Sequence, residues 1–140
     1  MKIVFAADGS ACTKKALAFL VTHENLAGAD DELLVLNVQP PLPPSLALMV
    51  SSDVANNTHR DEANKVLDPI KLFLERHPIR YRCDWVVGSA AAEIVEATRR
   101  EQAHIIVMGT HGHGLLGRAL MGSVAQRVVA DCDVPVLLVR

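Results

Sequence analysis

A glycine-rich stretch near the carboxyl end of the sequence carries its most distinctive chemistry. Residues 108–124 read MGTHGHGLLGRALMGSV and hold five of the eight glycines. Gly109 and Gly112 can adopt positive φ and turn their N–H groups toward an anion. Gly122 and Ser123 open a predicted helix, and the N-terminal amides of a helix favour a phosphate. The stretch predicts a polyphosphate cradle, and a flexible loop with turn glycines is equally consistent with the glycine content alone.

Two common phosphate motifs do not fit this stretch. A P-loop requires a lysine between its last glycine and the following serine, whereas Gly122 directly precedes Ser123. The pattern G-x-G-x-x-G occurs at residues 112–117, but it begins several residues after the nearest predicted strand. One further strand follows it, without the acidic residue that would hold a ribose. A P-loop and a dinucleotide fold are therefore both disfavoured.

The elements that must position this stretch alternate between strand and helix. Apolar runs predict strands at 2–7, 32–39, 79–88, 104–108 and 135–139. Helical spacing predicts helices at 11–22, capped by Ser10 or Asp8, at 53–76, at 90–102, capped by Ser89, and at 123–130. Such alternation indicates a parallel sheet with helices on both faces. Ligands of these folds bind at the carboxyl ends of the strands, where residues 7–10 and 109–123 would meet.

Three segments depart from simple patterns. Four prolines open the uncharged segment 40–52, which predicts a mobile, partly apolar loop. Pro69 removes a backbone donor from the helix at 53–76 and predicts a kink or a break near Asp68. Residues 79–88 alternate between apolar and charged side chains at their start, which is typical of an edge strand.

Composition excludes several classes of protein. The 140 residues carry 14 basic and 16 acidic side chains and a net charge of −2, so no overall positive field would attract nucleic acid or anionic lipid. No apolar run approaches the roughly 18 residues of a membrane helix, and no export signal is recognisable. The sequence thus predicts one cytoplasmic domain over residues 1–140. Its three separated cysteines are expected to be buried free thiols.

A longer motif does fit the glycine-rich stretch. The spacing Gly109-x2-Gly112-x9-Gly122-Ser123 resembles the G-x2-G-x9-G-[ST] nucleotide motif of the universal stress protein family. The opening IVFAADGS and the ending GSVAQRVVADCDVPVLLVR resemble the same family. The resemblance implies a three-layer α/β fold of the Rossmann-like, adenine nucleotide alpha hydrolase-like type, with a five-stranded parallel sheet in the order 3-2-1-4-5. It also implies ATP, or AMP or ADP, as ligand, and a homodimer formed through the last strand, whose apolar edge is expected to pair.

The resemblance implies a role for each matching residue. Asp8 would contact the ribose and is a candidate Mg²⁺ ligand, while the backbone of Val38 would recognise adenine. The other positions expected to bind the nucleotide are Ala6, Ala7, Met108, Gly109, Gly112, His113, Gly122, Ser123 and Val124.

One position departs from the family pattern. The residue after the second motif glycine is often basic in the family, and here it is His113, which is largely neutral at pH 7. Phosphate affinity is therefore expected to be weaker or to depend on pH. Arg118 can supply charge from the same loop or remain solvated. His111 and His113 are expected to be loop histidines, because two ligands do not complete a zinc site.

These features favour nucleotide binding over turnover. Phosphoryl transfer needs a positioned acceptor and positive charge at the transferred group, and the motif supplies no Walker lysine, arginine finger or evident general base. The sequence predicts a stress-response regulator or sensor whose ATP-bound state biases its dimer or an unidentified protein partner. A slow ATP hydrolase or phosphotransferase is the first alternative, and a nucleotide-free dimerisation module is the second.

Overall fold

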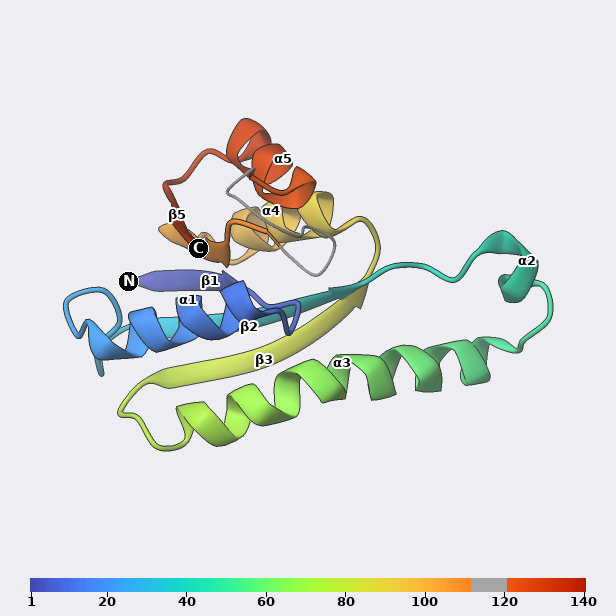
Figure 1. Ribbon diagram of the computed structural model, residues 1–140, viewed down its shortest axis with the longest axis horizontal. Coiled ribbons are helices and arrows are strands. Elements are labelled where there is room, and N and C mark those ends of the chain that lie inside the picture. Colours follow the sequence, from blue (N-terminus) through green and yellow to red (C-terminus); the bar gives the residue numbers. More distant parts are fainter. Residues whose placement is uncertain (112–120) are drawn as a thin grey trace.

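The computed structural model describes residues 1–111 and 121–140. Its elements follow the order β1 (Lys2–Ala6), α1 (Ala11–Thr22), β2 (Glu32–Gln39), α2 (Pro44–Ala47), α3 (Ser52–Leu74), β3 (Arg80–Val87), α4 (Ala90–Arg100), β4 (Ile105–Gly109), α5 (Ser123–Asp131) and β5 (Val136–Val139). The strands form one parallel sheet in the order β3-β2-β1-β4-β5, which confirms the predicted order (Figure 1). Every predicted strand and helix is present, with ends that agree within two residues.

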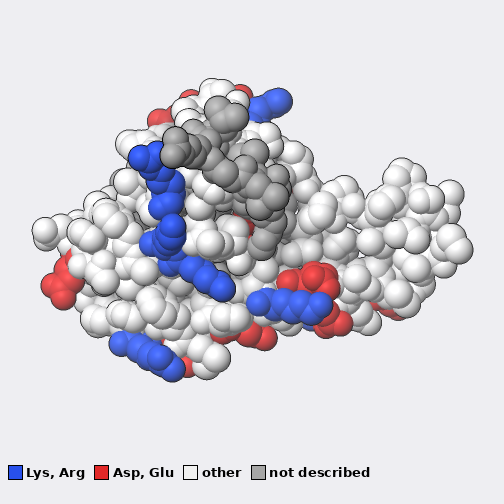
Figure 2. All heavy atoms as spheres, viewed as in Figure 1, with Lys and Arg blue, Asp and Glu red and all other residues white. Residues whose placement is uncertain are grey.

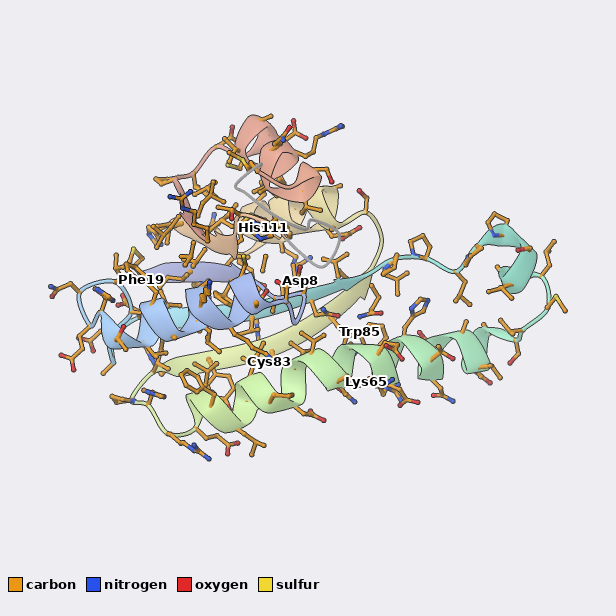
Figure 3. All side chains as sticks on the ribbon, in the orientation of Figure 1. Asp8, Phe19, Lys65, Cys83, Trp85 and His111 are labelled. Atoms are coloured by element: carbon orange, nitrogen blue, oxygen red, sulfur yellow. The ribbon has the colours of Figure 1, made fainter. Side chains whose placement is uncertain are left out.

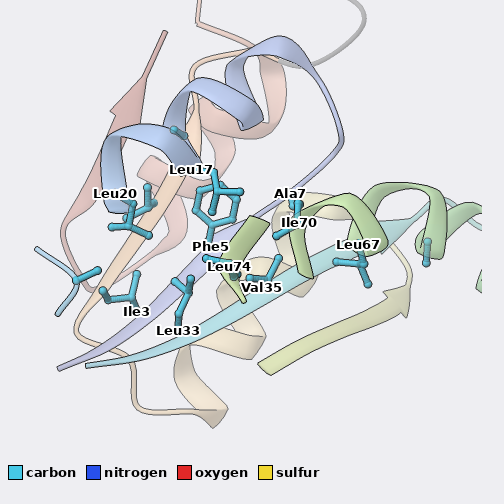
Figure 4. Packing of buried hydrophobic residues seen from close by; sticks show 14 residues of the cluster. Ile3, Phe5, Ala7, Leu17, Leu20, Leu33, Val35, Leu67, Ile70 and Leu74 are labelled. Atoms are coloured by element: carbon cyan, nitrogen blue, oxygen red, sulfur yellow. The ribbon is translucent and has the colours of Figure 1, made fainter. Parts of the chain in front are cut away.

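Helices cover both faces of the sheet, and successive residues of each central strand contribute apolar side chains to alternate faces. On one face, Ile3 and Phe5 of β1 and Leu33 and Val35 of β2 pack against α1 and α3, a cluster drawn in Figure 4. On the other face, Leu36, Ile106 and Met108 pack against α4 and α5 through Ile94 and Val128. Three layers result, because adjacent residues of a strand point to opposite faces.

Two of the predicted departures from regular structure are corrected. The segment 40–52 contains a short helix, α2, which Pro44 begins because its fixed φ suits the first helical position. This segment and the start of α3 extend away from the sheet (Figure 1). Helix α3 continues through Pro69 without a break. Pro69 is exposed, while Leu67, Ile70 and Leu74 beside it are buried, so packing compensates for the lost backbone donor.

The edge strands differ in their protection. β3 is an edge strand, as predicted, and its charged residues are exposed while Tyr81, Cys83 and Trp85 lie on the face toward α3 (Figure 3). β5 forms the opposite edge with four uncharged residues that are all partly buried.

The three cysteines are free, but Cys12 alone is buried, and Cys83 and Cys132 are half-buried, contrary to the expectation that all three would be buried. Within residues 1–111 and 121–140, no helix combines the length and apolar character needed to cross a membrane.

The central position of Phe5 provides a test of this packing. Phe5 is 0% exposed, and we expect Phe5→Ala to lower the free energy of unfolding by about 3–5 kcal/mol, because truncation leaves a cavity in the core. Phe19→Ala is the matched control, since Phe19 is 36% exposed and stacks on His23 at the surface. Urea denaturation monitored by circular dichroism measures both variants. Equal losses in the two would contradict the assigned core.

Candidate functional site

A cavity of about 620 Å³ lies where the carboxyl ends of β1, β2 and β4 meet the amino ends of α4 and α5. This is the edge of the sheet at which the two predicted segments were expected to converge. The residues lining it are Ala6, Ala7, Asp8, Thr13, Leu36, Val38, Ala90, Ile94, Met108, Gly109, Thr110, His111, Met121, Gly122, Ser123, Val124, Ala125 and Gln126. Among these described residues Asp8 is the one carboxylate, and none is lysine or arginine.

The turn between β1 and α1 holds Asp8 in a defined orientation. Asp8 Oδ1 accepts hydrogen bonds from the Ser10 backbone N–H at 2.8 Å and from Thr13 Oγ1 at 2.6 Å. Gly9, which lies between Asp8 and Ser10, has a φ of 80°, a conformation that favours glycine. Ser10 caps α1 by accepting from the Thr13 N–H, so both predicted capping residues order this turn. Asp8 is exposed, and its carboxylate therefore stands at the rim of the cavity.

A buried amide ties this turn to the neighbouring strand. Asn37 of β2 donates from Nδ2 to the Ala7 carbonyl at 2.8 Å, and its Oδ1 accepts from Gln39 Nε2 at 2.7 Å. The Ala7 N–H in turn donates to the Leu36 carbonyl. These bonds satisfy the buried polar groups where β1 ends. The floor of the cavity is therefore set by β2 as well as by β1.

The inner part of the cavity is apolar. Leu36, Ile94 and Met108 are buried there, and Ala6 and Val38 are half-buried beside them. The surface can accept a flat apolar group, with the backbone of Val38 at its edge as a source of polar contacts.

The opposite part of the cavity is formed by the start of α5. Gly122 is the N-cap residue, and its N–H donates to the Thr110 carbonyl at 2.6 Å. No side chain of the described residues caps this helix end, and Ser123 is exposed at its first position. The first N–H groups of a helix have no partner within the helix. This end of the cavity thus presents amide donors and the positive end of a helix dipole, which suit an anion.

Two of the motif glycines, Gly109 and Gly122, are required by close approach rather than by backbone conformation. A Cβ at position 109 would lie 2.5 Å from Cys12 Cβ, and one at position 122 would lie 3.1 Å from His111 Cα. Among the described glycines, Gly9 alone has positive φ, so the expectation of positive φ at Gly109 is wrong. Glycine at 109 lets the end of β4 touch the first turn of α1.

The structure brings most of the sequence-predicted residues to this one cavity. Lining it are Ala6, Ala7, Asp8, Val38, Met108, Gly109, Gly122, Ser123 and Val124. Gly112, His113 and Arg118 lie outside the described residues. No three metal-ligating side chains gather anywhere in 1–111 or 121–140, so the Mg²⁺ expectation rests on the Asp8 carboxylate.

Sequence reasoning missed several lining residues. Ala90 and Ile94 come from α4, whose start faces the same sheet edge, and the predicted helix at 90–102 was the available signal. Ser89 precedes that helix but makes no side-chain capping bond, contrary to expectation. His111 also lines the cavity, and its ring lies beside the thiol of Cys12, a pairing for which the sequence offers no signal.

A comparison with known protein families finds a match that covers the whole chain. The sequence profile of the Universal stress protein family covers residues 1–140. The chain belongs to the universal stress protein family. Universal stress protein MJ0531 of Methanocaldococcus jannaschii is 32% identical to it over 143 residues, which cover 99% of this chain and 81% of the relative. A universal stress protein of Thermus aquaticus is 36% identical over 138 residues, covering 99% of this chain and 97% of the relative.

Solved structures of universal stress proteins show the same architecture. Protein MJ0577 of Methanocaldococcus jannaschii superposes with a TM-score of 0.82 at 29% identity, covering 99% of this chain and 94% of that one. A family protein of Arabidopsis thaliana with AMP bound has a TM-score of 0.70 at 16% identity, covering 99% and 90%. The Archaeoglobus fulgidus protein in complex with dAMP has a TM-score of 0.68 at 22% identity, covering 100% and 98%. At these low identities, the last two comparisons establish a shared fold.

The contact at Gly109 can be tested without any ligand. We expect Gly109→Ala to lower the free energy of unfolding by about 1–3 kcal/mol, because the added Cβ would lie 2.5 Å from Cys12 Cβ and force β4 and α1 apart. Gly88→Ala is the matched control, since the atoms that its Cβ would meet belong to the flexible side chain of Glu93. Urea denaturation compares the two variants. A Gly109→Ala protein as stable as the control would disprove the close approach.

Proposed function

We propose that the cavity binds an adenine nucleotide, with the base in its inner part and the phosphates at the start of α5. The observation that carries this proposal is the division of one cavity into an apolar end and an amide-rich end. Leu36, Ile94 and Met108 provide the apolar end, and Gly122 with Ser123 opens the helix at the other. An adenine ring and a phosphate chain have the same division of chemistry.

The ribose would lie between these two ends, at Asp8. Its Oδ1 is oriented by Ser10 and Thr13, so the carboxylate is placed before any ligand arrives. A carboxylate accepts hydrogen bonds from ribose hydroxyls. Val38, at the end of β2, would offer backbone groups to the polar edge of adenine.

The charge of the cavity bears on the number of phosphates. With no lysine or arginine among its described lining residues, phosphate would be held by neutral amides, the Ser123 hydroxyl and the dipole of α5. Asp8 would repel a polyphosphate unless a cation lay between them. We propose that Mg²⁺ fills this role when ATP binds, because Mg²⁺ is commonly held by one or two carboxylates together with substrate phosphates.

Relatives of the same fold support adenine as the base. The Arabidopsis thaliana and Archaeoglobus fulgidus proteins were solved with AMP and dAMP. At identities of 16% and 22% these likenesses establish the fold alone. The cavity of this chain, with Gly109 and Gly122 in its lining, supports the proposal that it binds the same class of ligand.

We propose binding rather than turnover as the activity of the site. Phosphoryl transfer requires positive charge at the transferred group and an oriented acceptor. The described lining residues supply neither a lysine nor an arginine for that charge. Nucleotide occupancy would instead bias a dimer or a partner complex in a stress response.

Thermal unfolding tests the proposed ligand. AMP, ADP and Mg-ATP at about 100 times their Kd should each stabilise the protein by about 2.7 kcal/mol. Gly122→Val should abolish the shift in melting temperature, because its side chain enters the space occupied by Thr110 and His111. Ala130→Val, at an exposed position of α5, is the control and should retain the shift.

Two results would contradict this proposal. The first is the absence of any shift with all three nucleotides, combined with no nucleotide released from the heat-denatured protein. The second is an undiminished shift in Gly122→Val, which would place the ligand elsewhere.

We also propose that two copies of the chain pair through β5. The Ile106 N–H donates to the Pro135 carbonyl, and the Thr110 N–H donates to the Val139 carbonyl. Because alternate residues of a strand direct their polar groups to opposite sides, Val136 and Leu138 direct theirs outward. β3, the other edge, carries exposed charges, whereas β5 has none. An uncharged edge favours self-pairing, and two-fold pairing closes the assembly.

Sedimentation velocity at micromolar concentration tests this pairing. Leu138→Pro should produce a monomer, because it removes an outward N–H without breaking a bond to β4. Leu138→Ala keeps that donor and should remain a dimer. Circular dichroism must show that both variants stay folded. A wild-type monomer, or a dimer that persists in Leu138→Pro, would rule out pairing through β5.

A further inference from the structure

A cysteine and a histidine from distant parts of the chain meet beside the cavity, which His111 lines and Cys12 does not. Cys12 lies in the first turn of α1, and its Sγ is 3.5 Å from Nε2 and 3.8 Å from Nδ1 of His111. His111 follows β4 and lines the same cavity as Asp8, and both residues are labelled in Figure 3. The proposed nucleotide function uses neither the thiol nor the ring.

Thr110 orients the histidine ring. Its Oγ1 lies 3.1 Å from His111 Nδ1. A neutral ring protonated on Nδ1 would donate there to Thr110 and leave Nε2, the nitrogen nearer the thiol, to accept the Cys12 S–H. A nucleophile, a base and a group that orients the base are the components of an activated cysteine.

We propose that Cys12 is a site of oxidation by hydroperoxides, that His111 accepts its proton, and that the nucleotide cavity responds to the oxidation. His111 Nε2 takes the thiol proton, and the thiolate sulfur then attacks one oxygen of the peroxide. The O–O bond breaks, and the sulfur is oxidised by two electrons to a sulfenic acid. The departing hydroxide, or the alkoxide of an organic hydroperoxide, takes the proton from His111 and leaves as water or as an alcohol.

The surroundings of Cys12 connect the oxidised sulfur to the cavity. Cys12 is 4% exposed, its Cβ leaves no room for a side chain at Gly109, and its sulfur lies 3.5 Å from His111 Nε2, so an oxygen added to the sulfur would displace the His111 ring. His111 follows Thr110, whose carbonyl accepts the Gly122 N–H at the start of α5. Oxidation would therefore disturb the proposed phosphate end. This last step rests on the proposed nucleotide function.

The other two cysteines serve as internal controls. Burial raises the pKa of the Cys83 thiol to about 11, so little thiolate forms at neutral pH. The Cys132 thiol donates to the Val134 carbonyl at 3.2 Å. Among the described residues neither thiol makes a hydrogen bond to a histidine ring, and both cysteines are expected to react more slowly than Cys12.

The first experiment measures oxidation alone, without nucleotide. The intact protein is treated with hydrogen peroxide, sulfenic acid is trapped with dimedone, and mass spectrometry of peptides gives a rate for each cysteine. We expect the adduct to form first at Cys12. In His111→Phe, which keeps a ring but removes its base, we expect the rate of Cys12 oxidation to fall by a factor of about ten or more. Melting curves verify folding, and His111→Gln provides a second variant without a basic ring if His111→Phe is unstable.

Two outcomes of that experiment would overturn the proposal. One is a Cys12 rate no higher than those of Cys83 and Cys132. The other is a rate of Cys12 oxidation that is unchanged or faster in the His111 variants. That result would mean that His111 only shields the thiol from the peroxide.

The second experiment measures AMP affinity by calorimetry before and after peroxide treatment, with Cys12→Ser as control. Oxidation should weaken binding at least severalfold in the wild type and leave Cys12→Ser unchanged. Equal affinity before and after Cys12 oxidation would overturn the link to the cavity. If the reduced protein binds no nucleotide, the proposed function fails, while the rates from the first experiment still decide whether Cys12 is the oxidised site.

Discussion

The close contact between the end of β4 and the first turn of α1 is the constraint on which the site depends. Gly109 leaves no room for a side chain against Cys12, and Thr110 and His111, which follow β4, are therefore held beside the first turn of α1. This contact places Thr110 and His111 at the cavity and lets the Thr110 carbonyl meet the Gly122 N–H. A larger separation would leave the start of α5 too far from Asp8 for the two to border one cavity.

The cavity combines weak charge with many directed backbone groups. Its one described carboxylate is oriented by Ser10 and Thr13, and its amide-rich end is a helix start without a side-chain cap. Fixed amides cost little reorganisation when a ligand binds, so such a site can hold a phosphate without a strongly basic protein. The nearly neutral composition of the chain is consistent with this arrangement.

Much of the fold could be predicted because its signals are local. Apolar runs such as ELLVLNVQ indicate strands buried on both faces, and Ser10 marks the start of α1. The continuity of α3 through Pro69 could not be predicted, because it depends on packing of Leu67 and Ile70 against the sheet. The short helix α2 was missed for a related reason, since four clustered prolines obscure the one that begins a helix.

By itself, the sequence determined the strand order through its family resemblance, and it named half of the described residues that line the cavity, because motif spacing reports positions at the ends of strands. Tertiary structure alone decided why Gly109 must be glycine, which part of α4 closes the cavity, and that Cys12 meets His111. These three facts depend on distances between residues far apart in the chain. Local patterns report only which way a residue faces, and packing determines what it touches.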